Sequence, residues 1–184
     1  MNRFKTSILG SAALCTMLTF SLVASAKLNK TGSSTAGFKA SGPAGLNIDG
    51  KTSDVTVADD GTTVTITVSF ANIDTGISLR NTHTKKYLEA DKYPNATLKV
   101  PRSALKIPAA GAESSGDAKG TLTIHGKTKD VSFHYSAKAN GDTLDIKGTT
   151  DVNMNEYGVE TPSYLGVSVK PNVTVYANFQ AKDN

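Results

Sequence analysis

The run of residues 63–70 reads Thr63-Val64-Thr65-Ile66-Thr67-Val68-Ser69-Phe70. Apolar side chains alternate with hydroxyl side chains throughout it, which is the period of a β-strand with one buried face and one wet face. Asp60-Gly61 stands just before the run, and Asp-Gly ahead of an alternating run is a hairpin signal. The stretch therefore predicts an amphipathic strand that leaves a tight turn and points Val64, Ile66, Val68 and Phe70 at an interior.

The same alternation recurs on both sides of this run. The apolar residues that share a face within each further segment are Leu46 and Ile48; Val55 and Val57; Ala96, Leu98 and Val100; Val131, Phe133, Tyr135 and Ala137; Leu144 and Ile146; and Val173, Val175, Ala177 and Phe179. Turn residues at 126–128 and at Asn140-Gly141 separate the later segments. Two segments break the pattern, and we expect a loose Gly/Ser/Thr stretch over Lys30–Gly37 and a mobile loop over Pro108–Asp117.

The count of these segments predicts an all-β fold with eight to ten antiparallel strands. A sheet with one wet face buries its other face, and it does so by closing into a barrel of about eight strands with one short helical insert. Such a barrel is just wide enough to be filled by side chains or to hold one slim ligand. A transmembrane barrel has the same alternation, but it needs strands of about 9–11 residues and aromatic girdles. The segments are short, and the chain has only six Tyr, six Phe and no Trp from which to build girdles. Both observations favour the soluble barrel.

The first 26 residues have the pattern of a cleaved signal peptide. Arg3 and Lys5 precede an uncharged apolar run, and Ala24-Ser25-Ala26 forms a small-x-small cleavage site. The one cysteine, Cys15, lies within this leader. We therefore expect two parts, a leader at 1–26 and one barrel domain at 27–184 that is exported to the periplasm or secreted without disulfides. Loss of Arg3 and Lys5 lowers the formal net charge from +4 to +2, which gives no reason to expect a nucleic-acid partner.

A polar insert at Asp74–Pro94 interrupts the strands and predicts a helix over Ser78–Leu88. Arg80 and His83 lie three residues apart and would share a helix face. That face could bind a phosphate or carboxylate group. The alternative is that Arg80 pairs with a local carboxylate such as Asp74 and only ties the helix to the barrel rim.

The residues give no support for catalysis. A nucleophilic site needs a Ser or Cys beside a His that an acid orients, whereas His83, His125 and His134 fall in three separate elements. No closely spaced His pair predicts a zinc site. We expect His134 on the outer face, and His125 to serve as a turn residue after its strand. The predicted protein is a non-enzyme without metal or cofactor.

Two motifs resemble those of the YceI-like family of periplasmic or secreted lipid- and polyisoprenoid-binding proteins. The first comprises Asp74-Thr75-Gly76, Arg80, His83, Tyr87-Leu88 and Asp91-Lys92-Tyr93-Pro94, and the second is the run from Gly120 to Val131. The resemblance extends over about Gly37–Ala181 and implies a lipocalin-like barrel whose apolar pocket holds a polyisoprenoid or comparable lipid. The residues expected to contact this ligand are Phe38, Leu46, Ile48, Val64, Ile66, Val68, Phe70, Arg80, His83, Phe133, Tyr135, Val173, Val175 and Phe179.

A second interpretation belongs to a different functional class. The same apolar side chains could fill the barrel, which would then be a rigid scaffold. Lys85, Lys86 and Lys92 on the helical insert would dock a membrane or a partner protein. Association of two copies of the chain also stays open.

Overall fold

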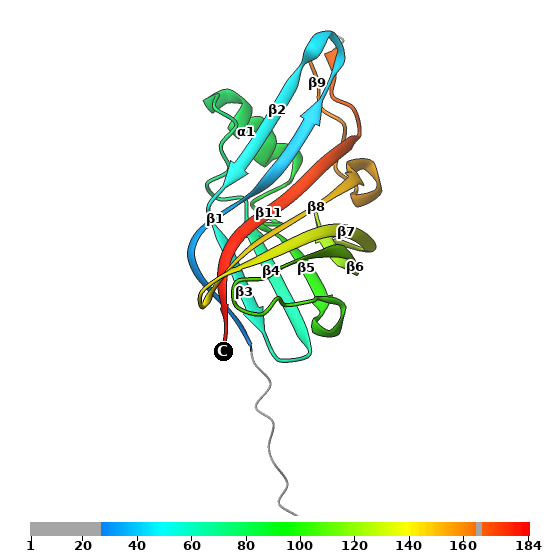
Figure 1. Cartoon of the computed structure of the whole chain (residues 1–184). Coiled ribbons are helices and arrows are strands. Elements are labelled where there is room, and N and C mark those ends of the chain that lie inside the picture. Colours follow the sequence, from blue (N-terminus) through cyan, green and yellow to red (C-terminus); the bar gives the residue numbers. More distant parts are fainter. Residues whose placement is uncertain (1–26, 165–166) are drawn as a thin grey trace, which may run out of the picture.

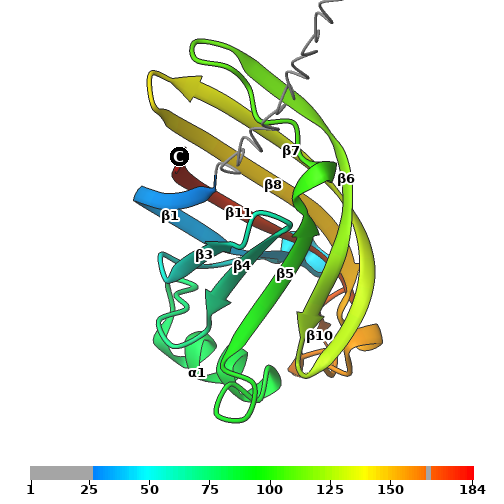
Figure 2. The ribbon, with the colours of Figure 1, turned by 90° about the horizontal axis from the view of Figure 1, so that it is seen from below.

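The computed structural model describes residues 27–164 and 167–184, which form an antiparallel sheet curled into a barrel (Figures 1 and 2). Within these residues the sheet has nine strands in the order β2-β1-β11-β8-β7-β6-β5-β4-β3. Their bounds are β1 Leu28–Ser41, β2 Asn47–Thr52, β3 Val55–Asp59, β4 Thr63–Ser69, β5 Asn95–Pro101, β6 Glu113–Ile124, β7 Lys127–Asn140, β8 Thr143–Asn153 and β11 Asn172–Asp183. The all-β prediction is confirmed. The predicted leader at 1–26 lies outside the described residues.

Short elements connect these strands. They are the α-helix α1 (Ser78–Tyr87), the 3-10 helices η1 (Pro43–Gly45), η2 (Arg102–Ala104) and η3 (Met154–Tyr157), and the two-stranded pair β9 (Ser163–Tyr164) and β10 (Val167–Ser168). Figure 1 shows α1 and β9 toward one end of the barrel, whereas the C-terminus lies at the other. The helix predicted over Ser78–Leu88 is therefore present and ends one residue earlier.

Strand alternation decides which side chains face the interior. In β7, Phe133, Tyr135 and Ala137 are buried, whereas His134 and Lys138 are exposed on the outer face. The strands are longer than expected, with 14 residues in both β1 and β7. The outer positions are nevertheless polar in this strand, which is the reverse of the apolar outer band of a transmembrane barrel.

The barrel closes without a continuous ladder between its two edges. The edge strands β2 and β3 are consecutive in the chain, and other contacts hold this seam. The Ser34 hydroxyl donates to the Ser53 carbonyl at 2.8 Å, and Lys51 and Asp74 form an isolated bridge with backbone hydrogen bonds of 2.9 and 2.8 Å. At the start of β1, the Leu28 amide donates to the Asp59 carboxylate at 2.8 Å.

The end that carries the C-terminus is packed and sealed. Arg102 of η2 pairs with both Asp59 and Asp183, and the Asp59 side chain has no exposed surface. These three charges join the end of β3 to the end of β11 across the seam. A packed cluster lies beside them, formed by Leu28, Val64, Ala139, Leu144, Phe179 and Ala181. We call this the closed end of the barrel.

Three local predictions were wrong. Residues Lys30–Gly37 are not loose but belong to β1, where they pair with β11 through a bulge between Thr31 and Ser34. The predicted loop at Pro108–Asp117 ends earlier, because β6 begins at Glu113 and pairs with β7. The β6–β7 turn is His125-Gly126, both with positive φ, so Lys127 and Thr128 already belong to β7. In the first two cases pairing with a neighbouring strand outweighs weak local strand propensity.

Replacement of Arg102 tests the seal at the closed end. Arg102→Met would leave the Asp59 carboxylate buried beside Leu28 with no opposite charge. Breaking a buried ion pair in this way costs about 3–5 kcal/mol. We expect a loss of that size in the free energy of unfolding from urea titration. Lys99→Met on the neighbouring β5 removes an exposed cation and should have little effect, so equal losses in both variants would contradict the seal.

Candidate functional site

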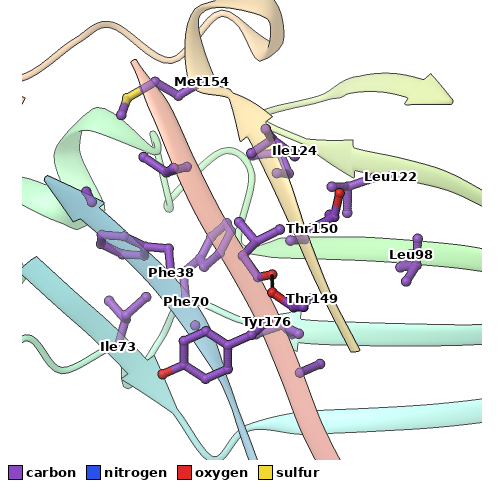
Figure 3. Close-up of a pocket in the computed structure, with 18 of the residues that line it drawn as sticks. Phe38, Phe70, Ile73, Leu98, Leu122, Ile124, Thr149, Thr150, Met154 and Tyr176 are labelled. Carbon is purple, nitrogen blue, oxygen red and sulfur yellow. Dashed lines mark hydrogen bonds between the residues drawn. The ribbon is translucent and has the colours of Figure 1, made fainter. Parts of the chain in front are cut away.

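An apolar cavity of about 980 Å³ occupies the barrel. It runs lengthwise, because β4 lines it from Val64 near the closed end to Phe70 just beyond the strand. Six residue steps at ~3.3 Å each give a length of roughly 20 Å. Figure 3 shows Phe38 of β1, Leu98 of β5, and Leu122 and Ile124 of β6 among the side chains that line it. The volume is at the upper end of the range of about 300–1,000 Å³ for ligand pockets.

Small residues at mid-strand positions leave this interior unfilled. Ala177 of β11 pairs with Gly148 of β8, and both line the cavity together with Ala137 of β7. A Cβ atom added to Gly148 would meet no heavy atom closer than the His134 carbonyl oxygen at 4.0 Å. A leucine or phenylalanine at these three positions would fill part of the barrel, but alanine and glycine supply almost no side-chain volume there.

All of the residues predicted to contact a ligand line this cavity. They are Phe38, Leu46, Ile48, Val64, Ile66, Val68, Phe70, Arg80, His83, Phe133, Tyr135, Val173, Val175 and Phe179. The Tyr135 hydroxyl is already engaged, because it accepts a hydrogen bond from the Lys106 amide at 2.7 Å. Phe38 fits against β2 because its ring lies over Gly50, where a Cβ atom would come within 2.4 Å of it. That these residues bind a ligand stays a prediction.

The opposite end of the cavity is its mouth, and α1 lies along it. Ile77, Leu79, Arg80, His83 and Lys86 line the cavity from this segment. No residue of α1 is buried, and the Ile77 position at its start has no side-chain cap. A helix normally buries one apolar stripe. Here the space beneath the helix is the cavity itself.

Polar contacts at its first turns and along its length hold α1 in place. The Asn81 amide group donates to Asp74 at 3.0 Å, and its oxygen accepts from the Thr75 amide at 2.7 Å. The hydrogen bond from Asn81, followed by that from the Gly76 amide, lowers the pKa of Asp74. The alternative pairing of Arg80 with Asp74 is therefore wrong, because Asn81 occupies that carboxylate. Among the described residues Arg80 has no carboxylate within ion-pair distance and lies half-buried at the mouth.

His125 joins three segments beside the mouth. Its Nδ1 lies 3.3 Å from the Tyr157 carbonyl of η3, and its Nε2 lies 3.4 Å from Glu89 without hydrogen-bond alignment. Its ring centroid is 4.8 Å from that of Tyr93. The sequence suggested only a turn residue, because the partners of His125 are distant in the chain. Tyr157 lies 32 residues after His125, and Glu89 and Tyr93 belong to the earlier polar insert. His134, by contrast, pairs with Asp117 on the outer face as predicted.

Two tyrosines that line the cavity have perturbed acidity. Burial, and then the charge of Glu156, raises the pKa of Tyr157, whose side chain is almost fully enclosed. Burial and the hydrogen bond to Asp49 raise the pKa of Tyr176 to about 12. Both phenols are therefore neutral at ordinary pH. Tyr157 adds no charge to the apolar wall, whereas Tyr176 alternates with the inward Val175 and Ala177 and contacts Asp49 and Lys39 on the outer face.

The described parts of the chain offer little other chemistry. Residues 27–164 and 167–184 contain no group of three His, Cys, Asp or Glu side chains that could hold a metal ion. Within the same residues no helix is long and apolar enough to span a membrane.

Comparison with known families gives one match that extends over most of the chain. The family model described as YceI-like domain matches residues 25–181. A UPF0312 protein of Pseudomonas putida strain W619 is 32% identical over 97 residues, which are 48% of this chain and 47% of that protein. A UPF0312 protein of Pseudomonas syringae pv. tomato is 27% identical over 121 residues, or 60% of this chain and 59% of that protein. The chain thus spans about half the length of the curated relatives it matches.

Solved structures share the fold at low sequence identity. A polyisoprenoid binding domain from Saccharophagus degradans, implicated in plant cell wall breakdown, has a TM-score of 0.70 and 16% identity, covering 87% of this chain and 99% of that one. BcnA of Burkholderia cenocepacia has a TM-score of 0.63 and 20% identity, covering 80% of this chain and 96% of that one.

Two alanines on one strand test whether the interior is hollow. Ala177 lines the cavity, whereas Ala181 is fully buried in the packed cluster four residues later on the same face of β11. Overpacking costs about 1–3 kcal/mol. We expect Ala181→Leu to lose that much stability in denaturant melts and Ala177→Leu to lose little. Similar losses in both variants would show that the interior at Ala177 is already packed.

Proposed function

We propose that this chain, which belongs to the YceI-like family, holds an apolar chain-like lipid such as a polyisoprenoid inside its barrel. The observation that carries the proposal is the cavity of about 980 Å³, lined along its length by aliphatic and aromatic side chains. The solved neighbour from Saccharophagus degradans, described as a polyisoprenoid binding domain, supports this ligand class.

The energy of such binding would come from burial of hydrocarbon. Each CH₂ group moved from water into an apolar site contributes about 0.8 kcal/mol, so one five-carbon isoprene unit contributes roughly 4 kcal/mol before ordering costs. A few units suffice for tight binding without strong polar contacts. This agrees with a lining that is mostly aliphatic and aromatic and that has Arg80, His83 and Lys86 at the mouth.

We infer that the polar end of the ligand lies at the mouth, against α1. The closed end is sealed by Arg102 and its two carboxylates, so a head group there would lose its hydration. At the mouth, Arg80, His83 and Lys86 line the cavity from one helix, with Glu160 as the acidic residue among the lining. An anionic head group, phosphate or carboxylate, fits Arg80 best, because guanidinium binds such groups in a bidentate manner.

The proposed role is that of a carrier or sequestering protein in the periplasm and not that of an enzyme. The signal-peptide pattern predicted for residues 1–26 supports export, and the separation of His83, His125 and His134 gives no catalytic grouping. The alternative of a packed scaffold is less well supported, because the volume at Gly148 and Ala177 is unfilled.

Lipid analysis of the purified protein tests the carrier proposal. We expect native mass spectrometry and organic extraction to recover a lipid from protein made in its own host. Ile66→Trp on β4 should displace that lipid and leave the thermal melt nearly unchanged, because the indole can enter the cavity. A large loss of stability, about 1–3 kcal/mol or more, with the lipid content unchanged would contradict the proposal.

A substitution in α1 tests the position of the head group. Arg80→Gln removes a cation that lines the cavity, and a hydrogen bond to a charged group contributes about 1.5–3 kcal/mol. We expect about 10- to 150-fold weaker binding of an isoprenoid phosphate and unchanged binding of the corresponding neutral alcohol. Lys99→Gln is the control, because Lys99 is an exposed cation of β5 that lies outside the cavity lining. Equal effects on phosphate and alcohol would place the head group elsewhere.

A further inference from the structure

We propose that the segment formed by Ile77, Leu79, Arg80, His83 and Lys86, here called the rim patch, docks the barrel mouth on an anionic lipid bilayer. This interaction goes beyond ligand binding and does not depend on which molecule fills the cavity. The chemistry recognised is that of a membrane surface: negatively charged head groups above hydrocarbon.

The apolar part of the rim patch is unusual on this molecule. Among residues 27–163 and 168–184, Ile77 and Leu79 are the large apolar side chains that are exposed, at 50% and 67% of their surface. They lie two residues apart in the chain and both line the cavity at its mouth. Scattered exposed apolar residues need no explanation, but a pair confined to the mouth marks a contact site.

The charged part of the rim patch complements an anionic surface. Helix α1 carries Arg80, Lys85 and Lys86 and no acidic residue. Leu79, His83 and Lys86 follow one another at spacings of four and three residues, so they lie along one side of the helix. All three are exposed. Lys85 is directed instead to the Ala71 carbonyl. Apolar residues beside basic ones are the composition by which a helix binds in the head-group region of a membrane.

A membrane fits the rim patch better than a partner protein does. A stable protein interface buries about 1,200–2,000 Å² in total around a packed centre, which two exposed aliphatic side chains do not provide. A bilayer needs only a few inserted side chains and nearby cations. Docking at the mouth would also let an apolar chain move between bilayer and cavity with little exposure to water.

Vesicle flotation tests the proposal with the protein as purified. The probes are vesicles of phosphatidylcholine alone and vesicles of phosphatidylcholine and phosphatidylglycerol in equal parts. We expect binding to the anionic vesicles that weakens as salt is added. Lys86→Gln should reduce the partition coefficient about fivefold, the factor for about 1 kcal/mol per basic residue at such a surface. Leu79→Ser should reduce it about tenfold through loss of apolar burial.

The matched control is Lys138→Gln. Lys138 is an exposed lysine in the half of β7 remote from the His125-Gly126 turn, toward the closed end, and its replacement should leave vesicle binding unchanged. Absence of binding to anionic vesicles, or equal effects of Lys86→Gln and Lys138→Gln, would overturn the proposal. Lipid content, measured in parallel by native mass spectrometry, separates the two ideas. Lipid without vesicle binding would reject docking alone, and vesicle binding without lipid would reject the carrier function alone.

Discussion

The ion pairs of Arg102 with Asp59 and Asp183 are the interaction on which the rest of the barrel depends. A hollow barrel lacks the central side-chain contacts that normally hold opposite walls together, so its stability must come from its ends and its seam. Within residues 27–164 and 167–184 no ladder joins the edge strands β2 and β3, and Arg102 connects β3 to β11 at this seam. The buried Asp59 carboxylate also accepts the Leu28 amide, which fixes the start of β1 at the same point. The packed cluster around Leu144 and Phe179 supplies apolar burial beside these charges.

The mouth is built in the opposite way. Helix α1 has ten residues, none of them buried, and isolated helices of this length are marginal in water. It is held by the Asp74–Asn81–Thr75 hydrogen bonds and by Lys85 at the Ala71 carbonyl. Regions with few buried apolar contacts open at low free-energy cost. The barrel therefore combines a closed end tied by buried charges with a mouth where Tyr87 and Leu88 pack against a buried cluster and polar contacts hold the first turns of α1.

Much of this arrangement could be predicted from the sequence, because the side-chain period of a strand fixes which residues share a face. Val64, Ile66 and Phe70 were assigned to the interior on alternation alone. The first half of β1 was missed because Gly32, Ser33 and Ser34 have weak strand propensity, and only pairing with β11 makes them a strand. Arg102 was missed as well, since its partners lie 43 and 81 residues away and no local pattern connects them. The tie formed by His125 was hidden for the same reason.

The alternation of apolar residues does not show whether the interior is full or empty. That depends on the size of the side chains and not on their hydrophobicity. Ala36, Ala177 and Gly148 lie opposite one another on β1, β11 and β8, so three neighbouring strands place small side chains at one level of the barrel. The larger residues of the same strands, Phe38, Phe179 and Val152, stand above or below that level. Apolar alternation treats alanine and phenylalanine alike, so it predicts which residues face the interior. A cavity depends in addition on small residues that lie beside one another on neighbouring strands. Register supplies that information, and only pairing of distant segments sets the register. The cavity is therefore a consequence of tertiary pairing. The sequence shows that these residues are small, but only the pairing of the strands shows that they lie side by side.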